Sequence, residues 1–578
     1  MHLKIVVVVI SLLFSNLLAS GQAFKDLNWH VRSEGSSHEG FKTLTLGPDG
    51  QTLVSGVFNG SDVNIGGIEA KLRGSVGNES FLALIDSSGN VSFVESFGST
   101  ALLFTDMSVA MDKAGDIFIS GTFTSAPGPV MPYQIEFFDT TLSVVPNNYG
   151  GAYPFYAKVS NKGSVIWIHK INSPKVLFAK SLDLDDDGNV YIGGPFSSSI
   201  KSNDSTYYAL DSSSTSFAND YFLLKVDSDG NDQWLKTFGS RERNNDLAIS
   251  VSKTGDIYAT GTWTGDTLFV GSKFLVNPKP EIGANPNGWH AKFNTDGDVQ
   301  WLVRHSDEDA TANDIKVNPA GGFITSVYSN APLVLNDVTY ETGYTIMRYN
   351  EEGVYQSAFH INGPEAMEIF PEVYAFPNRF FMVQEDGSVT IAIDFSEETI
   401  TVGETVIENN AGDFGSSDIV FTKINTDNDV DWVHHIGASE SEVVGSVAYY
   451  KNNIILVGST TSPLLKITDD TEILNSGTLT ADFFILSFQN KVSSSIKLAE
   501  NVDLDIYPNP IEDMVNINLQ NFNHKVTCEL IDINGSTLHS EQITGGISQI
   551  DLSSYPKGVY FISVSNETFM HTEKLIVK

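Results

Sequence analysis

The sequence has little cysteine, little positive charge and few long apolar runs. Its 578 residues include one cysteine, Cys528, which excludes an internal disulfide and a cluster of thiolate metal ligands. Lys and Arg number 34 against 71 Asp and Glu, so the formal net charge is −37. Binding to phosphates or anionic lipid requires concentrated cations, and we therefore expect no nucleic-acid partner and no docking on anionic lipid.

The N-terminus holds the one long apolar stretch. Lys4 precedes the apolar run Ile5–Phe14, and small residues follow in Leu17–Gly21. This order of a positive, an apolar and a small-residue region is typical of a secretory signal peptide. We predict a signal peptide over residues 1–21. No later segment approaches the roughly 20 apolar residues of a spanning helix, so we expect no transmembrane segment.

The remaining composition favours a folded all-β protein. Hydrophobic residues make up 41% and aromatic residues 11%, whereas charged residues make up 18%, so charge-driven disorder is not expected. The 48 glycines suggest many tight turns. A chain of this length holds two or more domains or one large repeat array.

One unit recurs along the chain. It is clearest in DLAISVSKTGDIYATGTWTG (Asp246–Gly265) and, after an insert, WHAKFNTDGDVQWLVRH (Trp289–His305). Alternation with period two and turns of Asp, Asn and Gly are typical of strands joined in hairpins. First halves begin at Phe41, Met107, Lys180, Asp246, Ala312, Arg379 and Gly445, and second halves at Phe81, Phe155, Tyr221, Trp289, Tyr344 and Ile419. Seven first halves predict a seven-bladed β-propeller, since a period of roughly 60–70 residues suits a four-stranded blade with an insert.

The seventh copy lacks its last strand. After Asp482–Asn490 no Trp-bearing strand follows, whereas DLNWHVRSEG (Asp26–Gly35) stands alone near the other end of the chain. One position of the last strand is aromatic in every copy: Phe93, Trp167, Trp234, Trp301, Tyr355, Trp432 and, in the orphan strand, Trp29. We expect the N-terminal strand to complete the last blade, and these aromatic side chains to pack between blades.

The repeats resemble the bacterial β-propeller repeat proteins described as SBBP-like. The resemblance rests on a Gly-[Asp/Asn]-[Ile/Val]-[Tyr/Phe] strand and an Asp-x-x-Gly-x-x-x-Trp hairpin over about Asp26–Asn490. Later copies depart from it, because Gly322 replaces the Asp, Tyr355 replaces the Trp and residues 451–453 form the seventh turn. The resemblance implies a propeller over residues 22–490.

A linker, residues 491–502, leads to a segment of a different kind, residues 503–578. Its motifs are Tyr507-Pro508-Asn509-Pro510, Asp532-x-Asn534-Gly535, Asp551-Leu552-Ser553, Gly558-x-Tyr560 and a terminal KLIVK that ends at Lys578. They resemble the C-terminal sorting domain of the type IX secretion system of Bacteroidota. The resemblance implies a small immunoglobulin-like β-sandwich that the type IX secretion machinery recognises and that is then removed. It implies that the sorting signal includes Tyr507, Pro508, Asn509, Pro510, Gly558, Tyr560 and Lys578.

Some side chains imitate metal or catalytic sites. Asp183, Asp185 and Asp187 before Gly188 resemble the start of a calcium loop, but the twelfth position is Gly194 rather than a bidentate acid. The alternative is an acidic hairpin turn. The histidines near the Trp strands have no metal-binding spacing, and no nucleophile elbow or phosphate loop occurs, so we predict no catalytic residues and no cofactor apart from this calcium hypothesis.

The long inserts are the candidate recognition segments. With four strands running up and down, the short Asp/Gly turns fall on one side of each blade. The long, irregular connections at residues 124–154, 197–219, 265–288 and 396–417 then fall on the other side. The predicted ligand-binding residues lie in and beside the third of these inserts: Trp263, Asp266, Phe269, Phe274 and Trp289.

These features predict a secreted or cell-surface propeller that binds a glycan or another extracellular macromolecule without catalysis. The alternative is a secreted hydrolase or lyase that acts on polysaccharide, and a third hypothesis is an adhesion component with no small ligand. Exposed aromatic side chains would favour a binding protein. Convergent carboxylates with perturbed pKa values would favour an enzyme.

Overall fold

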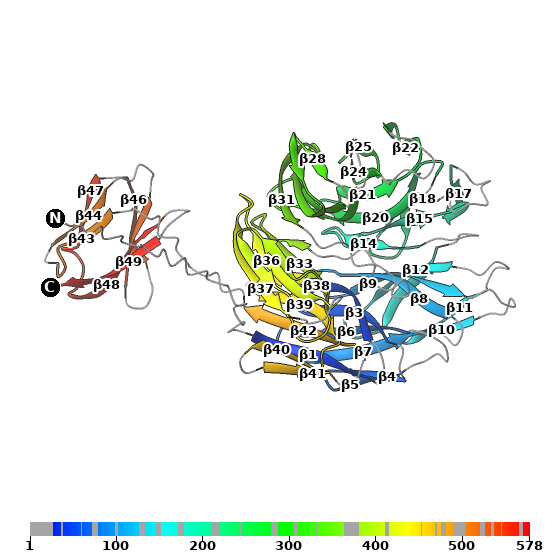
Figure 1. Cartoon of the computed structure of the whole chain (residues 1–578), viewed down its shortest axis with the longest axis horizontal. Helices are drawn as coiled ribbons and strands as arrows, with labels where there is room; N and C mark the ends of the chain where they lie inside the picture. The colour runs from blue at the N-terminus through cyan, green and yellow to red at the C-terminus, as the bar shows by residue number, and fades with distance from the viewer. Residues whose placement is uncertain are drawn as a thin grey trace, which may run out of the picture. The chain divides into compact units, whose positions relative to one another are not determined.

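A computed structural model gives the fold of the chain. It describes residues 27–35, 39–58, 61–71, 79–98, 102–125, 133–144, 152–171, 178–210, 219–242, 244–278, 287–305, 310–329, 332–362, 381–410, 416–451, 453–468, 471–475, 481–489, 503–511, 513–520, 526–532, 537–544, 546–565 and 570–578. Within these ranges every regular element is a strand, which confirms the all-β prediction. The chain divides into two compact units between Gln489 and Asn490 (Figure 1). The predicted signal peptide and linker lie outside the described residues.

The described part of the N-terminal unit contains seven four-stranded antiparallel meanders, which we number sheets 1 to 7. Their strands, in order, are β2 (Glu39–Leu46), β3 (Thr52–Phe58), β6 (Glu79–Ile85) and β7 (Val91–Phe97); β8 (Leu102–Met111), β9 (Ile117–Ser125), β12 (Ala152–Val159) and β13 (Val165–Lys170); β14 (Ser181–Leu184), β15 (Val190–Phe196), β18 (Asp220–Val226) and β19 (Asp232–Phe238); β20 (Asn244–Val251), β21 (Ile257–Trp263), β24 (Asn287–Phe293) and β25 (Val299–Arg304); β26 (Ala310–Val317), β27 (Phe323–Ser329), β30 (Gly343–Tyr349) and β31 (Tyr355–Asn362); β32 (Phe381–Val383), β33 (Val389–Phe395), β36 (Asp418–Ile424) and β37 (Val430–Ile436); β38 (Glu442–Tyr450), β39 (Asn453–Thr460), β42 (Asp482–Gln489) and β1 (Leu27–Gly35).

The N-terminal strand is the fourth strand of sheet 7. In β1, Trp29 pairs with Ser487, and Val31 pairs with Ile485 of β42. The predicted pairing of the first strand with the last repeat is therefore confirmed. The far end of β1 also pairs with β4, so sheet 7 continues into a hairpin of the first repeat.

Neighbouring sheets contact one another through their first strands. The contacts run from β2 to β8, β14, β20, β26, β32 and β38, and β38 contacts β2 again. The apolar core lies between sheets, as where Leu53 and Leu82 of sheet 1 share one cluster with Val109 and Ile119 of sheet 2. Because each strand buries one row of side chains against each neighbouring sheet, the alternating residues of the middle strands are apolar on both faces.

The connection between the second and third strands holds a two-stranded hairpin in every repeat of the described part. The hairpins are β4 (Asp62–Ile65) with β5 (Ile68–Lys71), β10 (Tyr133–Phe137) with β11 (Thr140–Val144), β16 (Ser199–Ser202) with β17 (Ser205–Tyr208), β22 (Thr267–Val270) with β23 (Lys273–Val276), β28 (Leu333–Leu335) with β29 (Val338–Tyr340), β34 (Thr399–Val402) with β35 (Thr405–Glu408), and β40 (Leu464–Thr468) with β41 (Thr471–Leu474). The prediction of irregular inserts is therefore wrong at these segments. These strands are short, but alternation lets a strand such as β34 bury one apolar row, Ile400 and Val402, on the sheets beneath it.

The Asp-x-x-Gly-x-x-x-Trp motif joins neighbouring sheets. The Asp227 carboxylate accepts the backbone N–H groups of Asp229 and Asn231 at 3.1 and 2.8 Å, and Gly230 closes the turn with a φ of 90°. Trp167 of the preceding sheet donates its Nε1–H to the Ser228 carbonyl at 3.1 Å. The same bond joins Trp29 to Ser87 at 3.2 Å, Trp234 to Thr295 at 3.0 Å and Trp301 to Glu351 at 2.8 Å. The prediction that these tryptophans pack between repeats is confirmed.

The C-terminal unit consists of two antiparallel sheets. One contains β43 (Asp503–Tyr507), β44 (Met514–Gln520) and β47 (Gly546–Asp551), and the other contains β46 (Thr537–Ile543), β45 (Val526–Ile531), β48 (Gly558–Ser565) and β49 (Met570–Val577). Their inner faces form one apolar core, in which Ile517 and Ile550 of the first sheet pack with Leu530 and Ile562 of the second. Cys528 belongs to this core, and burial raises the pKa of its thiol to about 12.

Candidate binding surface

The hairpin β22–β23 presents an exposed aromatic pair. Its sequence alternates, so Leu268 and Val270 are buried whereas Phe269 and Phe274 are 46% and 62% exposed. The two phenylalanines are direct cross-strand partners, and their ring centroids lie 6.5 Å apart. The turn between them uses Gly271 with a φ of 57°. Antiparallel pairing thus places both rings on the solvent side of the hairpin.

Backbone hydrogen bonds fix this hairpin on its neighbours. Phe269 exchanges two bonds with Gly239 of the preceding repeat, at 2.8 and 3.0 Å. At the base of the hairpin, Asn277 donates its N–H to the Asp266 carbonyl at 2.8 Å. The strand β23 also contacts β25 of the same repeat. The aromatic pair therefore stands on a rigid support rather than on a mobile loop.

The structure separates the five predicted ligand-binding residues into two groups. Phe269, Phe274 and the exposed Asp266 lie on the same hairpin. Trp263 and Trp289 are 0% exposed and belong to the core cluster that also holds Leu268 and Val270. Their rings hold the hairpin from beneath, and their burial leaves no ring face for a ligand. Aromatic side chains of this size fill cores when both neighbouring sheets cover them.

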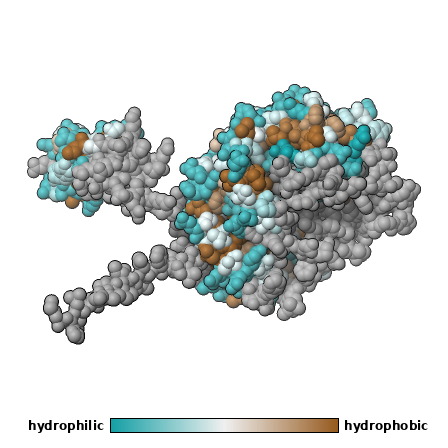
Figure 2. All heavy atoms as spheres, turned by 45° about the horizontal axis from the view of Figure 1, so that its top comes forward, coloured by the Kyte–Doolittle hydropathy of each residue, from teal (hydrophilic) through white to brown (hydrophobic). Residues whose placement is uncertain are grey.

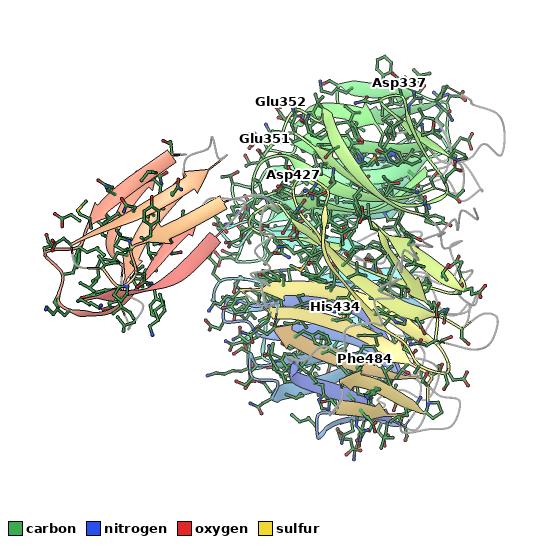
Figure 3. All side chains as sticks on the ribbon, turned by 60° about the vertical axis from the view of Figure 1, so that its left-hand side comes forward. Asp337, Glu351, Glu352, Asp427, His434 and Phe484 are labelled. Atoms are coloured by element: carbon green, nitrogen blue, oxygen red, sulfur yellow. The ribbon has the colours of Figure 1, made fainter. Side chains whose placement is uncertain are left out.

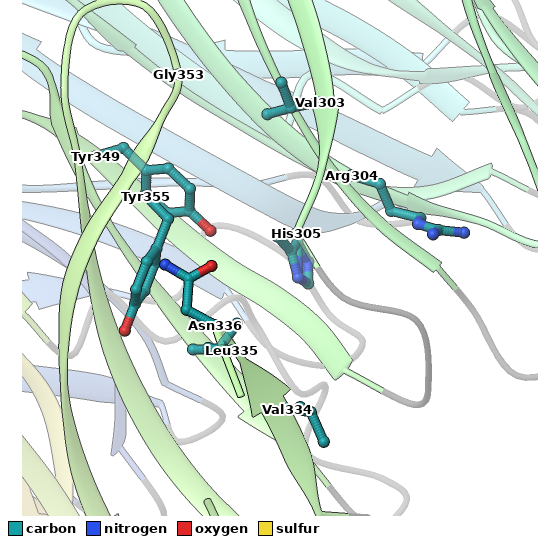
Figure 4. Close-up of a pocket in the computed structure, with 9 residues that line it drawn as sticks. All are labelled: Val303, Arg304, His305, Val334, Leu335, Asn336, Tyr349, Gly353 and Tyr355. Carbon is teal, nitrogen blue, oxygen red and sulfur yellow. The ribbon is translucent and has the colours of Figure 1, made fainter. Parts of the chain in front are cut away.

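A cavity that the sequence did not indicate lies beside the end of strand β25. It has a volume of about 420 Å³ between the end of β25, the hairpin β28–β29 and the β30–β31 turn (Figure 4). Nine residues line it: Val303, Arg304, His305, Val334, Leu335, Asn336, Tyr349, Gly353 and Tyr355. The one available signal was Tyr355, which stands where most of the repeats have tryptophan.

Two buried histidines stack beside this cavity. The ring centroids of His290 and His305 lie 4.9 Å apart, and Tyr349 packs edge-on against His290 at 5.2 Å. Burial lowers the pKa of His305 to about 3, with a further lowering from Arg304. Burial also lowers the pKa of His290 well below its usual value, and His305 adds to this. Both imidazoles are therefore neutral at neutral pH.

The acidic turn that resembles a calcium loop is a hydrogen-bonded hairpin turn. Asp185 accepts the backbone N–H groups of Asp187 and Asn189 at 3.1 and 2.9 Å. The Asp183 carboxylate instead accepts the Val251 N–H of the next sheet at 2.7 Å. Across the described ranges, no group of three or more His, Cys, Asp or Glu side chains is arranged to hold a metal ion. These aspartates are engaged with the backbone, as the turn interpretation requires.

Two carboxyl groups with raised pKa values lie between sheets 6 and 7. Burial raises the pKa of Glu442 to about 7 and that of Asp394 to about 6. Glu442 is fully buried and accepts the Ala438 N–H at 2.8 Å and the Thr460 hydroxyl at 2.7 Å. Asp394 accepts a backbone hydrogen bond from Val444. Both groups hold strand ends together and do not converge on a substrate site.

The predicted sorting residues come together at one end of the C-terminal unit. Asn509 donates to the Lys574 carbonyl at 2.6 Å and accepts the Ile576 N–H at 3.0 Å. Lys578 donates its backbone N–H to the Ile511 carbonyl at 2.8 Å. The Tyr-Pro-Asn-Pro segment is thereby fastened along the last strand, β49. Gly558 begins the adjacent strand β48, in which Tyr560 is buried and donates its hydroxyl to the Pro556 carbonyl at 2.7 Å.

Residues 505–578 match the secretion system C-terminal sorting domain. The C-terminal unit is thus a type IX sorting domain, as its motifs predicted. It indicates export by the type IX secretion machinery, either into the medium or to the cell surface. In the described part of the chain, no helix has the length and hydropathy needed to cross a membrane.

Other comparisons give weak likenesses. No curated protein matches the chain. A copper-bound fungal alcohol oxidase has 10% identity over 96% of this chain and 98% of its own, with a TM-score of 0.33. A rhamnogalacturonan lyase has 11% identity over 71% and 91% of the two chains, with a TM-score of 0.24. Scores this low bear neither on the fold nor on the activity.

Proposed function

We propose that this protein is a secreted or surface-displayed seven-bladed β-propeller that binds a glycan without catalysis. In this proposal, sheets 1 to 7 are the blades, residues 1–21 are a signal peptide, and the sorting domain delivers the propeller and is then removed. The cycle of first-strand contacts and the pairing of β1 with β42 support the closed ring. A closed ring leaves only short sheet edges, which suits a protein that works outside the cell.

The observation that carries the binding role is the exposed pair Phe269 and Phe274. Exposing two aromatic rings side by side is unfavourable in water unless a ligand covers them. The top of the N-terminal unit, where Figure 1 places β22, β25 and β28, comes forward in Figure 2 and carries a hydrophobic cluster. Aromatic faces stack on the C–H faces of sugar rings, and the neighbouring Asp266 carboxylate can accept sugar hydroxyl groups.

A glycan fits this surface better than a protein partner. A stable protein interface buries about 800 Å² on each side, far more than two phenylalanine rings supply. The turns β28–β29 and β30–β31 of the next repeat carry the acidic side chains Asp337, Glu351 and Glu352 (Figure 3). A neutral polysaccharide does not suffer the charge repulsion that an acidic partner would meet here. The raised carboxyl pKa values do not favour the hydrolase or lyase, since Glu442 is engaged inside the structure.

A glycan array tests the proposal with the full chain and the variant Phe269→Ala/Phe274→Ala. We expect binding to at least one neutral glycan, with a loss of at least tenfold in the variant. Replacing the whole insert by a linker is unsuitable, because Leu268 and Val270 are part of the core. The matched control is Tyr208→Ala, which removes an exposed aromatic side chain from hairpin β16–β17. An array without any specific signal for the wild-type chain would refute the glycan proposal.

A further inference from the structure

The four-stranded sheet of the C-terminal unit exposes apolar side chains on its outer face. In β48, Tyr560 and Ile562 enter the core, so Val559 and Phe561 face outward. Ile576 of the adjacent strand β49 is the cross-strand partner of Val559 and also faces outward (Figure 1). These three outward side chains are 36% to 39% exposed. Direct cross-strand partners lie about 5 Å apart, so the three form one apolar surface.

This surface continues across the other two strands of the sheet. Ile531 of β45 is the cross-strand partner of Phe561 and is half-buried. Leu538 of β46, which is 41% exposed, stands beside Ile531 where the pairing shifts by one residue. The apolar surface therefore reaches all four strands. We call it the sorting-domain patch and define it as Ile531, Leu538, Val559, Phe561 and Ile576.

Away from the patch, the same face of the sheet is polar. Glu529 of β45 pairs with Ser540 of β46. Farther along these two strands, Gln542 donates to the Thr527 hydroxyl at 2.7 Å. The exposed apolar side chains of this face are thus gathered at one end rather than scattered singly. A contiguous apolar area with polar surroundings is typical of an interaction site.

Lysines adjoin the apolar end of the face. Residues 503–578 contain four lysines against ten Asp and Glu. Lys574 is the cross-strand partner of Phe561, Lys578 directly follows β49, and Lys557 directly precedes β48. All three of these lysines are exposed. An apolar centre with a charged rim is the usual construction of a protein interface.

The predicted sorting residues hold the patch in position. Asn509 donates to the Lys574 carbonyl at 2.6 Å and accepts the Ile576 N–H at 3.0 Å. Ile511 donates its N–H to the Ile576 carbonyl at 2.7 Å and accepts the N–H of Lys578 at 2.8 Å. These bonds occupy backbone groups on the free edge of β49. The strand therefore offers its outer face to a partner, while this part of its edge is already paired.

From these observations we infer that the sorting-domain patch is the surface by which the type IX secretion machinery holds this chain, and that the receiving protein offers an apolar surface rimmed by carboxylates. The inference rests on the proposed sorting role and adds the contact face and the chemistry of the partner. Carboxylates are the complement of the three rim lysines. A small patch suits a contact that must be released after delivery, since transient interfaces lie at the low end of interface sizes.

Delivery of the full chain in a host that has the type IX machinery tests the patch. The test variant is Val559→Thr/Phe561→Thr/Ile576→Thr, because threonine suits a strand but removes the exposed apolar surface. A second variant, Lys574→Glu, reverses one charge of the rim. The measurement is the amount of chain at the cell surface and in the medium, compared with the amount retained in the periplasm.

The matched control is Met514→Thr/Ile547→Thr on the outer face of the three-stranded sheet. Both side chains are exposed, but they stand at opposite ends of the β44–β47 pair, because Met514 is opposite Asp551 and Ile547 is opposite Asn518. The control therefore removes similar apolar side chains that form no patch. Hydrogen exchange over residues 503–578, measured on full chains purified from a host without the machinery, establishes that each variant is folded.

We expect delivery to fall about tenfold or more in the threonine variant, since removing the centre of an interface costs at least that factor in affinity. Delivery should also fall in Lys574→Glu and stay at the wild-type level in the control. Normal delivery of the threonine variant, or an equal fall in the control, would overturn the inference. Normal delivery of Lys574→Glu would overturn the carboxylate rim.

The remaining outcomes also decide. If hydrogen exchange shows the threonine variant to be unfolded, Lys574→Glu alone is the test, and its normal delivery overturns the inference. A wild-type dimer in size-exclusion chromatography that the folded threonine variant abolishes would assign the patch to a second copy of this chain and overturn it. Delivery of a chain truncated before Asp503 would refute the sorting role itself. Retention of that truncated chain with normal delivery of the threonine variant would overturn the patch alone.

Discussion

Adding one methyl group at Gly230 tests the contact that joins neighbouring sheets. In Gly230→Ala the new Cβ would lie 2.8 Å from His169 Nε2 and 3.0 Å from the Trp167 ring. Gly188→Ala is the matched control, since Gly188 has a similar φ of 78° but the nearest atom to its Cβ is 3.7 Å away. Both variants put alanine at positive φ, but only one also disturbs the Trp167 contact.

The expected free-energy changes follow from these contacts. Alanine in the left-handed region costs roughly 1 kcal/mol, which is the whole effect at Gly188. At Gly230 the displaced indole also loses its hydrogen bond to Ser228, about 1 kcal/mol, and the overpacked ring adds about 1 kcal/mol. We therefore expect losses of unfolding free energy of about 1 kcal/mol for Gly188→Ala and about 3 kcal/mol for Gly230→Ala.

Urea unfolding of the full chain, followed by tryptophan fluorescence, measures both changes. All seven tryptophans precede residue 490, so the signal reports on the N-terminal unit and is silent about the sorting domain. Trp167→Phe removes the indole donor, and combining it with Gly230→Ala should give less than the sum of the two single losses. Equal losses in Gly188→Ala and Gly230→Ala, or full additivity with Trp167→Phe, would refute the inter-sheet role of the motif.

Three further perturbations test other parts of the molecule. Deleting residues 22–35 removes β1 and exposes the edge of β42, so the melting temperature should fall sharply, and an unchanged melt would contradict closure of the ring. The pKa of Glu442 is about 7, above its ordinary 4.5, so the stability that this carboxyl contributes is complete below pH 4.5 and is lost as pH rises through 7, by about 3 kcal/mol. Glu442→Gln should remove this dependence on pH. The measurement is the difference in melting temperature between the variant and the wild type at each pH. A chain truncated before Asp503 should fold but stay in the periplasm of its host, and its appearance at the cell surface, assayed by surface proteolysis, would contradict the sorting role.

Local and repeated patterns were readable in the sequence. The Asp-x-x-Gly turns form from neighbouring residues alone, because a carboxylate bonds to N–H groups two and four positions on and glycine accepts positive φ. Repetition then supplied long-range information, since an orphan strand and an incomplete last copy had to pair. The sorting motifs could also be recognised in the sequence. In the structure Asn509 bonds to Lys574 of strand β49, and Lys578, which directly follows β49, bonds to Ile511.

The fold of the inserts and the exposure of the predicted ligand-binding residues depended on tertiary contacts. A four-residue alternation does not say which row faces the core, so the hairpins and the exposure of Phe269 and Phe274 followed only from the packing of neighbouring repeats. For the same reason Trp263 and Trp289, which looked available in the sequence, are buried between sheets.

The sequence by itself therefore determined the strands, the turns, the seven-fold repetition and the sorting domain, because each is encoded by adjacent or periodic residues. Only the tertiary structure decided which side chains line the pocket beside β25. The cavity collects His305 from one sheet, Asn336 from a hairpin and Tyr349 from the next sheet, and no fixed spacing relates them. The volume left between packed side chains becomes visible only when the neighbouring sheets are in place.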